Sequence, residues 1–267
     1  MASLKGVRVA ILATGGFEQD ELMKPRQALN EAGAETTVVS PNGGEIRGWK
    51  HTEWGDRISV DESLKNVAPE HFDALLLPGG VISPDKLRME PKAVQFVRSF
   101  FNAGKPVAAI CHGPWSVIEA GAAYGRRIAS WPSLKTDLRN AGAEWIDEEA
   151  VIDRNLVSAR KPDDIPAFNK AMIELFASSK ERGATLRAPG TPSGISEHNG
   201  DAQVHARRIK QMLDDLATHA REDSHKISDP KAQALFETTS ETLHGLMKAY
   251  SHYEEHGERQ GAEFERH

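Results

Sequence analysis

Cys111 and His112, neighbours in the sequence, are the two side chains best suited to covalent chemistry. Cys111 is the only cysteine of the 267 residues, so it cannot form a disulfide within the chain. A cysteine thiolate is a strong nucleophile, and a histidine beside it can accept the thiol proton. The usual alternative for a lone cysteine is a buried, unreactive side chain. The position of Cys111 along the chain favours catalysis over that alternative.

Cys111 stands where a predicted strand passes into a predicted helix. The apolar run 105–110 precedes it, and a helical pattern begins at Pro114. A nucleophile on such a turn is presented at the carboxyl end of the sheet, facing backbone N–H groups of the helix N-terminus. These donors lower the pKa of a thiol and can hold an oxyanion. We therefore predict that Cys111 is a nucleophile with a lowered pKa.

The elements around this turn alternate between short apolar runs and helical patterns. Strand-like runs are predicted at 6–12, 36–39, 74–77 and 107–110, and helical patterns at 19–32, 92–103, 114–123 and 163–179. Such alternation is typical of an α/β fold with a mostly parallel sheet covered on both faces. Two β-hairpins are also predicted, one as an insertion at 45–60 and one late in the chain at 151–157.

The composition changes near residue 183. Residues 183–201 are rich in glycine and proline and poor in apolar side chains, which is typical of a linker. Two amphipathic helical patterns follow, around 209–216 and 234–250, and Asp229 before Pro230 is a predicted helix cap. We predict an α/β domain over 1–182 and, over 183–267, a C-terminal extension made of a linker and a helical hairpin. Two helices cannot close a core alone, so they pack on the α/β domain or on a second copy of the chain.

Composition and charge exclude several classes of function. The net charge is −6 and basic residues form only pairs, so we expect no nucleic-acid partner. No apolar run approaches the roughly 18 residues of a membrane span, so no membrane partner is expected. With no recognisable signal peptide and a single cysteine, the expected location is cytoplasmic.

The sequence resembles the ThiJ/PfpI family, which belongs to the superfamily of class I glutamine amidotransferase-like folds. The resemblance covers about residues 4–180, and its motifs occur in the family's order. They are Gly16-Phe17-Glu18, Leu77-Pro78-Gly79-Gly80, Ala109-Ile110-Cys111-His112-Gly113-Pro114, Asn140-Ala141-Gly142-Ala143-Glu144-Trp145 and Arg160-Lys161-Pro162-Asp163-Asp164. This resemblance implies a flavodoxin-like three-layer sandwich for the α/β domain.

The resemblance also implies roles for individual residues. Cys111 matches the nucleophile, His112 the general base, and Glu18 the acid whose protonated carboxyl group hydrogen bonds the sulfur. Gly80 and the N–H of His112 match the oxyanion pocket. The flanking glycines of both motifs are further binding candidates: Gly79 and Gly113. Taken without the family, Glu18 is a surface carboxylate at a helix start and the glycine pair is a tight turn.

Asp85 is the candidate third member of the catalytic group. In PfpI-type members a carboxylate after the glycine pair reaches the histidine of a neighbouring subunit, and Asp85 matches it less closely than a glutamate would. The alternative is a plain helix N-cap. We expect the side chains of Cys111 and His112 to leave the turn in different directions, so that His112 needs an outside partner. The resemblance therefore implies a homo-oligomer, a dimer or a hexamer built from dimers.

Aromatic and histidine side chains elsewhere are weaker candidates. Trp49, His51 and Trp54 in the first hairpin are candidate substrate contacts, although packing is the commoner role of such residues. The tail is rich in histidine, with His252 and His256 one helical turn apart. Without a third ligand a solvated face is the favoured interpretation, so we expect no metal.

The family's activities share one chemistry, the attack of a thiolate on a carbonyl group. The first expectation is a cysteine-dependent, stress-protective enzyme for reactive carbonyls, of the glutathione-independent glyoxalase or deglycase type, which converts methylglyoxal to lactate without a cofactor. An intracellular peptidase or amidase is the second, because the same thiolate could cleave an amide. A redox sensor or holdase chaperone is the alternative that is not an enzyme.

Overall fold

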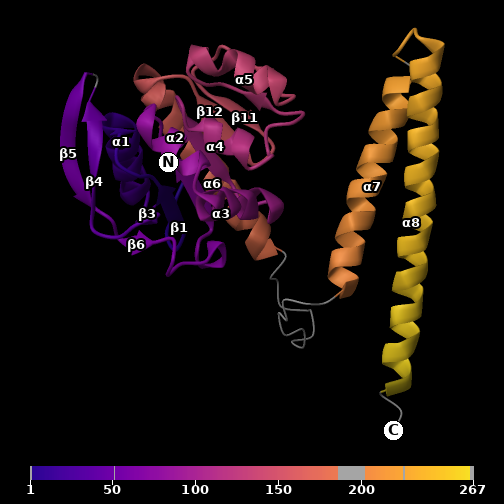
Figure 1. Cartoon of the computed structure of the whole chain (residues 1–267). Coiled ribbons are helices and arrows are strands. Elements are labelled where there is room, and N and C mark those ends of the chain that lie inside the picture. Colours follow the sequence, from indigo (N-terminus) through magenta and orange to yellow (C-terminus); the bar gives the residue numbers. More distant parts are fainter. Residues whose placement is uncertain (1, 51, 186–201, 225, 265–267) are drawn as a thin grey trace. The chain divides into compact units, whose positions relative to one another are not determined.

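The structure is a computed structural model that describes residues 2–50, 52–185, 202–224 and 226–264. The chain divides into two compact units, residues 1–191 and 192–267, each of which is described by itself (Figure 1). The predicted boundary lay at 182/183. The last helix of the first unit, α6 (Ile165–Thr185), continues past that point. Among the described residues no helix is both long and apolar enough to span a bilayer.

A seven-stranded sheet forms the centre of the first unit. Its strands lie in the order β11-β12-β8-β7-β1-β3-β6, and every neighbouring pair is parallel except β11 with β12. Their bounds are β1 Arg8–Leu12, β3 Glu35–Ser40, β6 Glu62–Ser63, β7 Ala74–Leu77, β8 Val107–Ile110, β11 Val151–Asp153 and β12 Leu156–Ala159. The inner strands β7, β8 and β12 are buried along their whole length, as expected for a parallel sheet covered on both faces.

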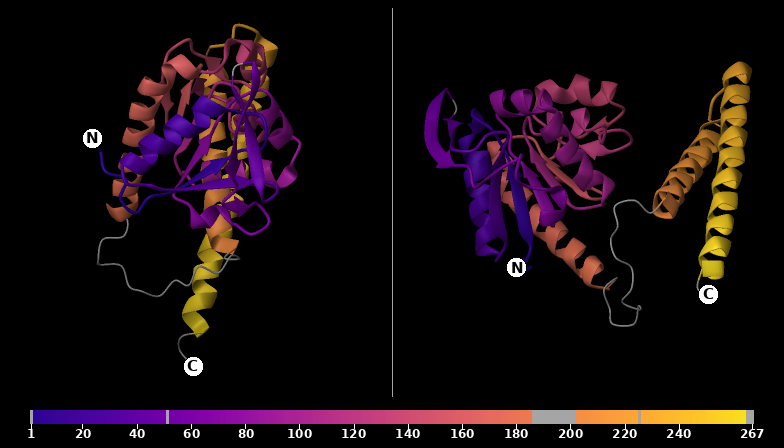
Figure 2. Two further views of the ribbon diagram at one scale, coloured as in Figure 1. Left: turned by 90° about the vertical axis from the view of Figure 1, so that its left-hand side faces the viewer. Right: turned by 60° about the horizontal axis from the view of Figure 1, so that its bottom comes forward.

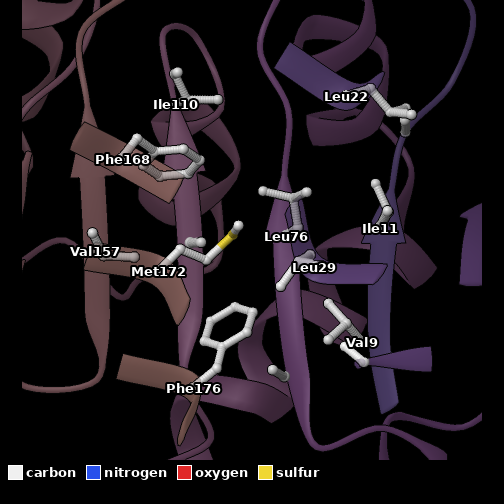
Figure 3. Close-up of a cluster of buried hydrophobic side chains, with 14 of the residues drawn as sticks. Val9, Ile11, Leu22, Leu29, Leu76, Ile110, Val157, Phe168, Met172 and Phe176 are labelled. Atoms are coloured by element: carbon white, nitrogen blue, oxygen red, sulfur yellow. The ribbon is translucent and has the colours of Figure 1, made fainter. Parts of the chain in front are cut away.

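Helices cover both faces of this sheet, so the unit has three layers (Figures 1 and 2). On one face lie α1 (Gln19–Glu31) and α6, whose apolar side chains pack on the central strands (Figure 3). The other face is covered by four helices: α2 Ile82–Arg88, α3 Pro91–Asn102, α4 Pro114–Glu119 and α5 Lys135–Asn140. The predicted α/β class, with a flavodoxin-like mostly parallel sheet, is therefore confirmed.

Both predicted hairpins are present. The first consists of β4 (Glu45–Lys50) and β5 (Glu53–Ser59), paired antiparallel and joined to the short strand β2 (Phe17–Glu18) in a separate small sheet. The second is β11 with β12. A further short parallel pair consists of β9 Arg127–Ile128 and β10 Glu144–Trp145, and single 3-10 turns lie at Pro69–His71, Pro132–Leu134 and Pro162–Asp164.

The second unit is an antiparallel pair of helices, α7 (Ala202–Ser224) and α8 (Pro230–Phe264) (Figure 1). Asp229 caps α8 as predicted, because its Oδ1 accepts a hydrogen bond of 2.9 Å from the N–H of Lys231. The two helices are joined along their contact by the hydroxyl of Ser240, which donates to the carbonyl of Ala217 at 2.9 Å. The predicted helical extension is therefore a hairpin.

Candidate active site

Cys111 occupies a strained turn between β8 and α4. Its φ of 61° lies in the left-handed region, which residues other than glycine seldom adopt and which costs about 1–3 kcal/mol. Backbone hydrogen bonds hold the turn on both sides: the N–H of Cys111 donates to Ala159 at 3.0 Å, and its carbonyl accepts from Trp131 at 2.9 Å. The side chain is only 6% exposed. The sequence thus builds the predicted strand-to-helix elbow.

Two glycines after β7 allow the chain to approach this sulfur closely. A Cβ atom on Gly79 would lie 2.4 Å from Oε2 of Glu21 and 2.7 Å from the Cβ of Cys111. Gly80 has a φ of 83°, and a Cβ there would lie 2.5 Å from the backbone nitrogen of Glu18. Any side chain at either position would therefore push the two loops apart.

The carboxyl group that hydrogen bonds the Cys111 sulfur belongs to Glu21, not to Glu18 as the family motif suggested. Glu18 precedes α1 and pairs with Trp49 of β4, whereas Glu21 lies in the first turn of α1 on its buried face. The N–H of Gly79 donates to Oε2 of Glu21 at 3.0 Å and so orients the carboxyl group. Oε1 is buried and makes no hydrogen bond to the described residues.

Burial controls the protonation of this pair. It raises the pKa of Glu21 to about 8, so the carboxyl group keeps its proton at neutral pH. Burial, together with the charge of an ionised Glu21, also raises the pKa of Cys111, while the N–H groups of Gly80 and His112 act in the opposite direction. The predicted lowering of the thiol pKa is therefore wrong for this environment. A thiolate forms most easily while Glu21 is neutral and can donate its O–H to the sulfur.

His112 is in contact with the sulfur, contrary to the expectation that the two side chains diverge. Its Nδ1 lies 3.2 Å from Sγ of Cys111, and its Nε2 lies 3.4 Å from the hydroxyl of Ser133. Trp115 and Trp131 flank the ring, with centroid distances of 5.0 and 6.1 Å. Burial lowers the pKa of His112 to about 4, so the imidazole is neutral and can accept a proton at physiological pH.

A pocket of about 680 Å³ opens beside these groups. Trp49 lines it, so this residue stays a candidate substrate contact, whereas Trp54 packs edge-on against Trp49 and is not part of the lining. His51 lies outside the described residues. The pocket is bounded by Gly16, Glu18, Glu21, Trp49, Gly80, Val81, Ile82, Cys111, His112, Trp131, Ser133 and Pro162.

Two other candidates lie apart from the pocket. Asp85 is an exposed residue inside α2, which excludes the N-cap role, and within this chain it is not among the pocket residues. Gly113 donates its N–H to the carbonyl of Ile110 at 2.8 Å. A Cβ at Gly113 would lie 2.4 Å from the carbonyl oxygen of Leu77, so this glycine allows close packing of two strand ends.

The described residues contain no group of three or more His, Cys, Asp and Glu side chains placed to hold a metal ion. The groups beside the pocket that can take part in chemistry are a thiol, a protonated carboxyl group and a neutral imidazole.

Comparison with known proteins gives this arrangement a family. The family model described as DJ-1/PfpI family matches residues 7–175, which is more than half of the chain. The chain belongs to the DJ-1/PfpI family. A deglycase of Pyrococcus abyssi is 44% identical over 170 residues, covering 64% of this chain and 99% of that protein. Protein/nucleic acid deglycase 2 of Escherichia coli is 41% identical over 172 residues, covering 64% and 98%.

One solved structure is similar beyond the family domain. It is a two-domain protein of Anabaena variabilis with dj-1/thij/pfpi-like and ferritin-like domains, 27% identical to this chain with a TM-score of 0.59. The similarity covers 92% of this chain and 71% of the other. Because residues 1–191 are less than three quarters of the chain, the matched part must extend into the helical hairpin.

In this DJ-1/PfpI member, sequence reasoning missed several pocket residues. Glu21 could have been found from its spacing. It lies one helical turn before the buried Pro25 and two turns before the buried Leu29, so it falls on the apolar face of the helix, where a carboxylate is unusual. Trp131 and Ser133 follow β9, Trp131 directly before the 3-10 turn Pro132–Leu134 and Ser133 within it, in a segment without a periodic pattern. Nothing in their spacing indicates that they reach His112.

Proposed function

We propose that this protein is a cysteine-dependent enzyme that acts on reactive carbonyl compounds, either free or as early adducts of amino groups. The observation that carries the proposal is the carboxyl group of Glu21 beside the Cys111 sulfur, with a pKa raised to about 8. Such a group can give and take a proton near neutral pH. The deglycase names of the relatives support the same class of reaction.

The reaction on methylglyoxal begins with addition of Cys111 to the aldehyde carbon. A carbon–sulfur bond forms and the carbonyl oxygen takes up the thiol proton by way of His112, which gives a hemithioacetal. A base then removes the proton on C1, a proton returns to C2, and the former ketone becomes an alcohol while C1 becomes a thioester. Water hydrolyses the thioester to lactate and restores the thiol. C1 is oxidised and C2 reduced within one molecule, so no external oxidant is needed.

Glu21 is suited to the proton transfer between the two carbons. Its Oε1 has no hydrogen-bond partner among the described residues, and the carboxyl group belongs to the lining of the pocket. The N–H groups of Gly80 and His112 point toward the sulfur and supply the donors for the oxygen that develops negative charge. We assign proton transfer to Glu21 and polarisation of the carbonyl group to these two amides.

The size of the pocket favours a substrate larger than methylglyoxal alone. A volume of about 680 Å³ lies in the range of sites for drug-sized ligands, whereas methylglyoxal has only five heavy atoms. Trp49 and Trp131 supply apolar walls that could contact the remainder of an adduct. We therefore include adducts on side chains or nucleotides among the substrates, with the free dicarbonyl as the minimal one.

Amide hydrolysis is the second candidate, favoured by the contact of 3.2 Å between Sγ of Cys111 and Nδ1 of His112. A nucleophile and a base at this distance are the minimal apparatus of a cysteine hydrolase. Such a reaction needs no proton transfer between neighbouring carbon atoms, so a neutral glutamine in place of Glu21 should not abolish it.

We further propose that the enzyme is a homo-oligomer in which Asp85 of a second copy approaches His112. Asp85 is exposed and could be reached by another subunit. Asp85→Asn and His112→Ala proteins should each have low activity, and mixing them under exchange conditions should restore part of it through hybrid sites. If a fully exchanged mixture shows no recovery, Asp85 does not act between subunits.

The deciding experiment compares two substrates across three proteins. Wild type, Cys111→Ser and Glu21→Gln are assayed for lactate formation from methylglyoxal and for cleavage of a fluorogenic peptide. The carbonyl proposal expects lactate from wild type only. Peptide cleavage that survives in Glu21→Gln, without lactate from any protein, would establish the hydrolase instead. Activity of Cys111→Ser equal to wild type would refute both.

A further inference from the structure

The hairpin of α7 and α8 has one apolar face and one polar face. The helices contact each other through a regular series with alternating steps of three and four residues, which includes the buried Ala217 and Ala220 of α7 and the buried Ser240 and Leu243 of α8. Among the side chains of the hairpin that the structure describes, five large apolar ones lie outside this contact and are 40–65% exposed: Ile209, Met212, Leu216, Leu235 and Leu246.

These five side chains share one face of the hairpin. Leu216 directly precedes the buried Ala217 on α7, and Leu246 directly precedes a contact residue, Met247, on α8. Successive residues of a helix are rotated by about 100° around its axis. In two antiparallel helices, the residue just before a contact residue therefore points to the same side of the pair on both helices. The exposed apolar residues therefore form one surface across both helices.

The opposite face of the hairpin is polar. The residues one position after each contact residue lie on this face. They include Thr218 and Arg221 on α7 and Glu241 and His244 on α8, all of them exposed. By contrast, on α8 the apolar face consists of positions 235, 239, 242, 246 and 249, and none of these five residues is charged. This asymmetry shows which face is built for burial.

We infer that this apolar face binds the same face of a second copy of the chain, so that two hairpins form a four-helix bundle. The contact would be isologous, because one surface meets its own copy across a two-fold axis. A two-layer arrangement of this kind is how four-helix bundles enclose a core.

The size of the face agrees with a stable dimer contact. The 23 residues of α7 span about 34 Å, and two adjacent helices are about 20 Å wide. The face therefore measures about 700 Å², close to the roughly 800 Å² that each partner buries in a typical specific interface.

The Anabaena variabilis protein also supports a second copy of the chain as the partner of the apolar face. Its ferritin-like domain accompanies a dj-1/thij/pfpi-like domain, and part of that chain has no counterpart here. Ferritin-like folds are bundles of four helices. Since the described residues of this chain supply only two helices beyond the α/β unit, a second copy provides the other two.

The test uses the full-length protein in four forms. Wild type is compared with Leu216→Glu/Leu235→Glu, with Leu216→Lys/Leu235→Lys, and with a control on the polar face, Thr218→Glu/Ala234→Glu. Hydrogen exchange of residues 202–264 and the molar mass by light scattering are measured for each form and for a 1:1 mixture of the glutamate and lysine forms.

We expect amide exchange in α7 and α8 to be at least tenfold slower in wild type and in the control than in either apolar-face variant. The mixture should regain slow exchange, because opposite charges can meet only across two copies. Equal exchange in all four forms would overturn the inference, since the face would then be open to solvent. Fast exchange in both apolar-face variants that stays fast in their mixture would also overturn the inference. It would point instead to docking of the apolar face on the chain's own α/β unit.

Discussion

Replacing Glu21 with glutamine should change how the reactivity of Cys111 depends on pH. In the wild type, the thiolate forms most easily while Glu21 is neutral, because the negative charge of an ionised Glu21 raises the pKa of Cys111. The charge of Glu21 thus opposes the thiolate once the pH exceeds the carboxyl pKa of about 8.

The magnitude follows from this coupling. Below pH 8 the thiolate fraction of the wild type rises tenfold per pH unit, and above pH 8 it levels off because the neutral carboxyl form becomes scarce at the same rate. Glutamine has no charge to gain, so the thiolate fraction of Glu21→Gln continues to rise. The two proteins should react alike at pH 6–7 and differ about tenfold at pH 9, one unit above the carboxyl pKa of about 8.

Iodoacetamide alkylation of the single cysteine, followed by mass spectrometry from pH 6 to 10, measures this difference without reference to any substrate. Glu18→Gln is the matched control, because Glu18 lines the same pocket. In this variant the alkylation rate should still level off at high pH, as in the wild type, and we call this level part the alkylation plateau. Removal of its charge should only move the start of the plateau to lower pH, since Glu18 contributes to the raised pKa of Glu21. Parallel profiles for wild type and Glu21→Gln up to pH 10 would refute the coupling.

Three further outcomes are expected. The pKa of Glu21 rises on folding from about 4.5 to about 8, so this residue costs no stability below pH 4.5 and an increasing amount as the pH rises toward 8. Urea unfolding should therefore show Glu21→Gln gaining on the order of a few kcal/mol over wild type by pH 8. Gly79→Ala should abolish the alkylation plateau by displacing Glu21, whereas Gly43→Ala, which meets no atom within 4 Å, should leave it unchanged. Asp164→Ala removes a buried carboxylate that accepts from Arg160 at 2.8 and 3.0 Å, and should lower the free energy of unfolding by about 1–3 kcal/mol in denaturant titrations.

The regular part of the fold was predictable because burial leaves a pattern in the sequence. The runs at β7 and β8 are apolar over four consecutive residues, as expected of strands that are buried on both faces. The two-residue strands β2 and β6 leave no such pattern, since their pairing depends on neighbours distant in the sequence. The helix α2 has only seven residues, too few for a clear helical pattern, so the alternative role offered for Asp85, a helix N-cap, was wrong, because Asp85 lies inside the helix.

The position of the nucleophile was predictable, but the directions of its neighbours were not. Cys111 and its elbow follow from a strand, a cysteine and a helix-starting Pro114 in succession. The contact between Cys111 and His112 depends on a φ of 61° at the cysteine, which no residue type at that position reveals. Glu18 and Glu21 are three residues apart, and only the point at which α1 begins decides which of them faces the sulfur.

The raised thiol pKa shows why a helix N-terminus alone does not activate Cys111. Helix α4 has only six residues and begins at Pro114, which has no N–H, while the N–H of Gly113 is already bonded to Ile110. Few free donors therefore remain to oppose the cost of burying a charge. A thiol of this kind reacts slowly with agents that require a free thiolate. The proposed addition to a carbonyl group does not require a free thiolate, because the carbonyl oxygen takes up a proton as sulfur adds, and His112 and Glu21 lie in the same pocket to transfer that proton.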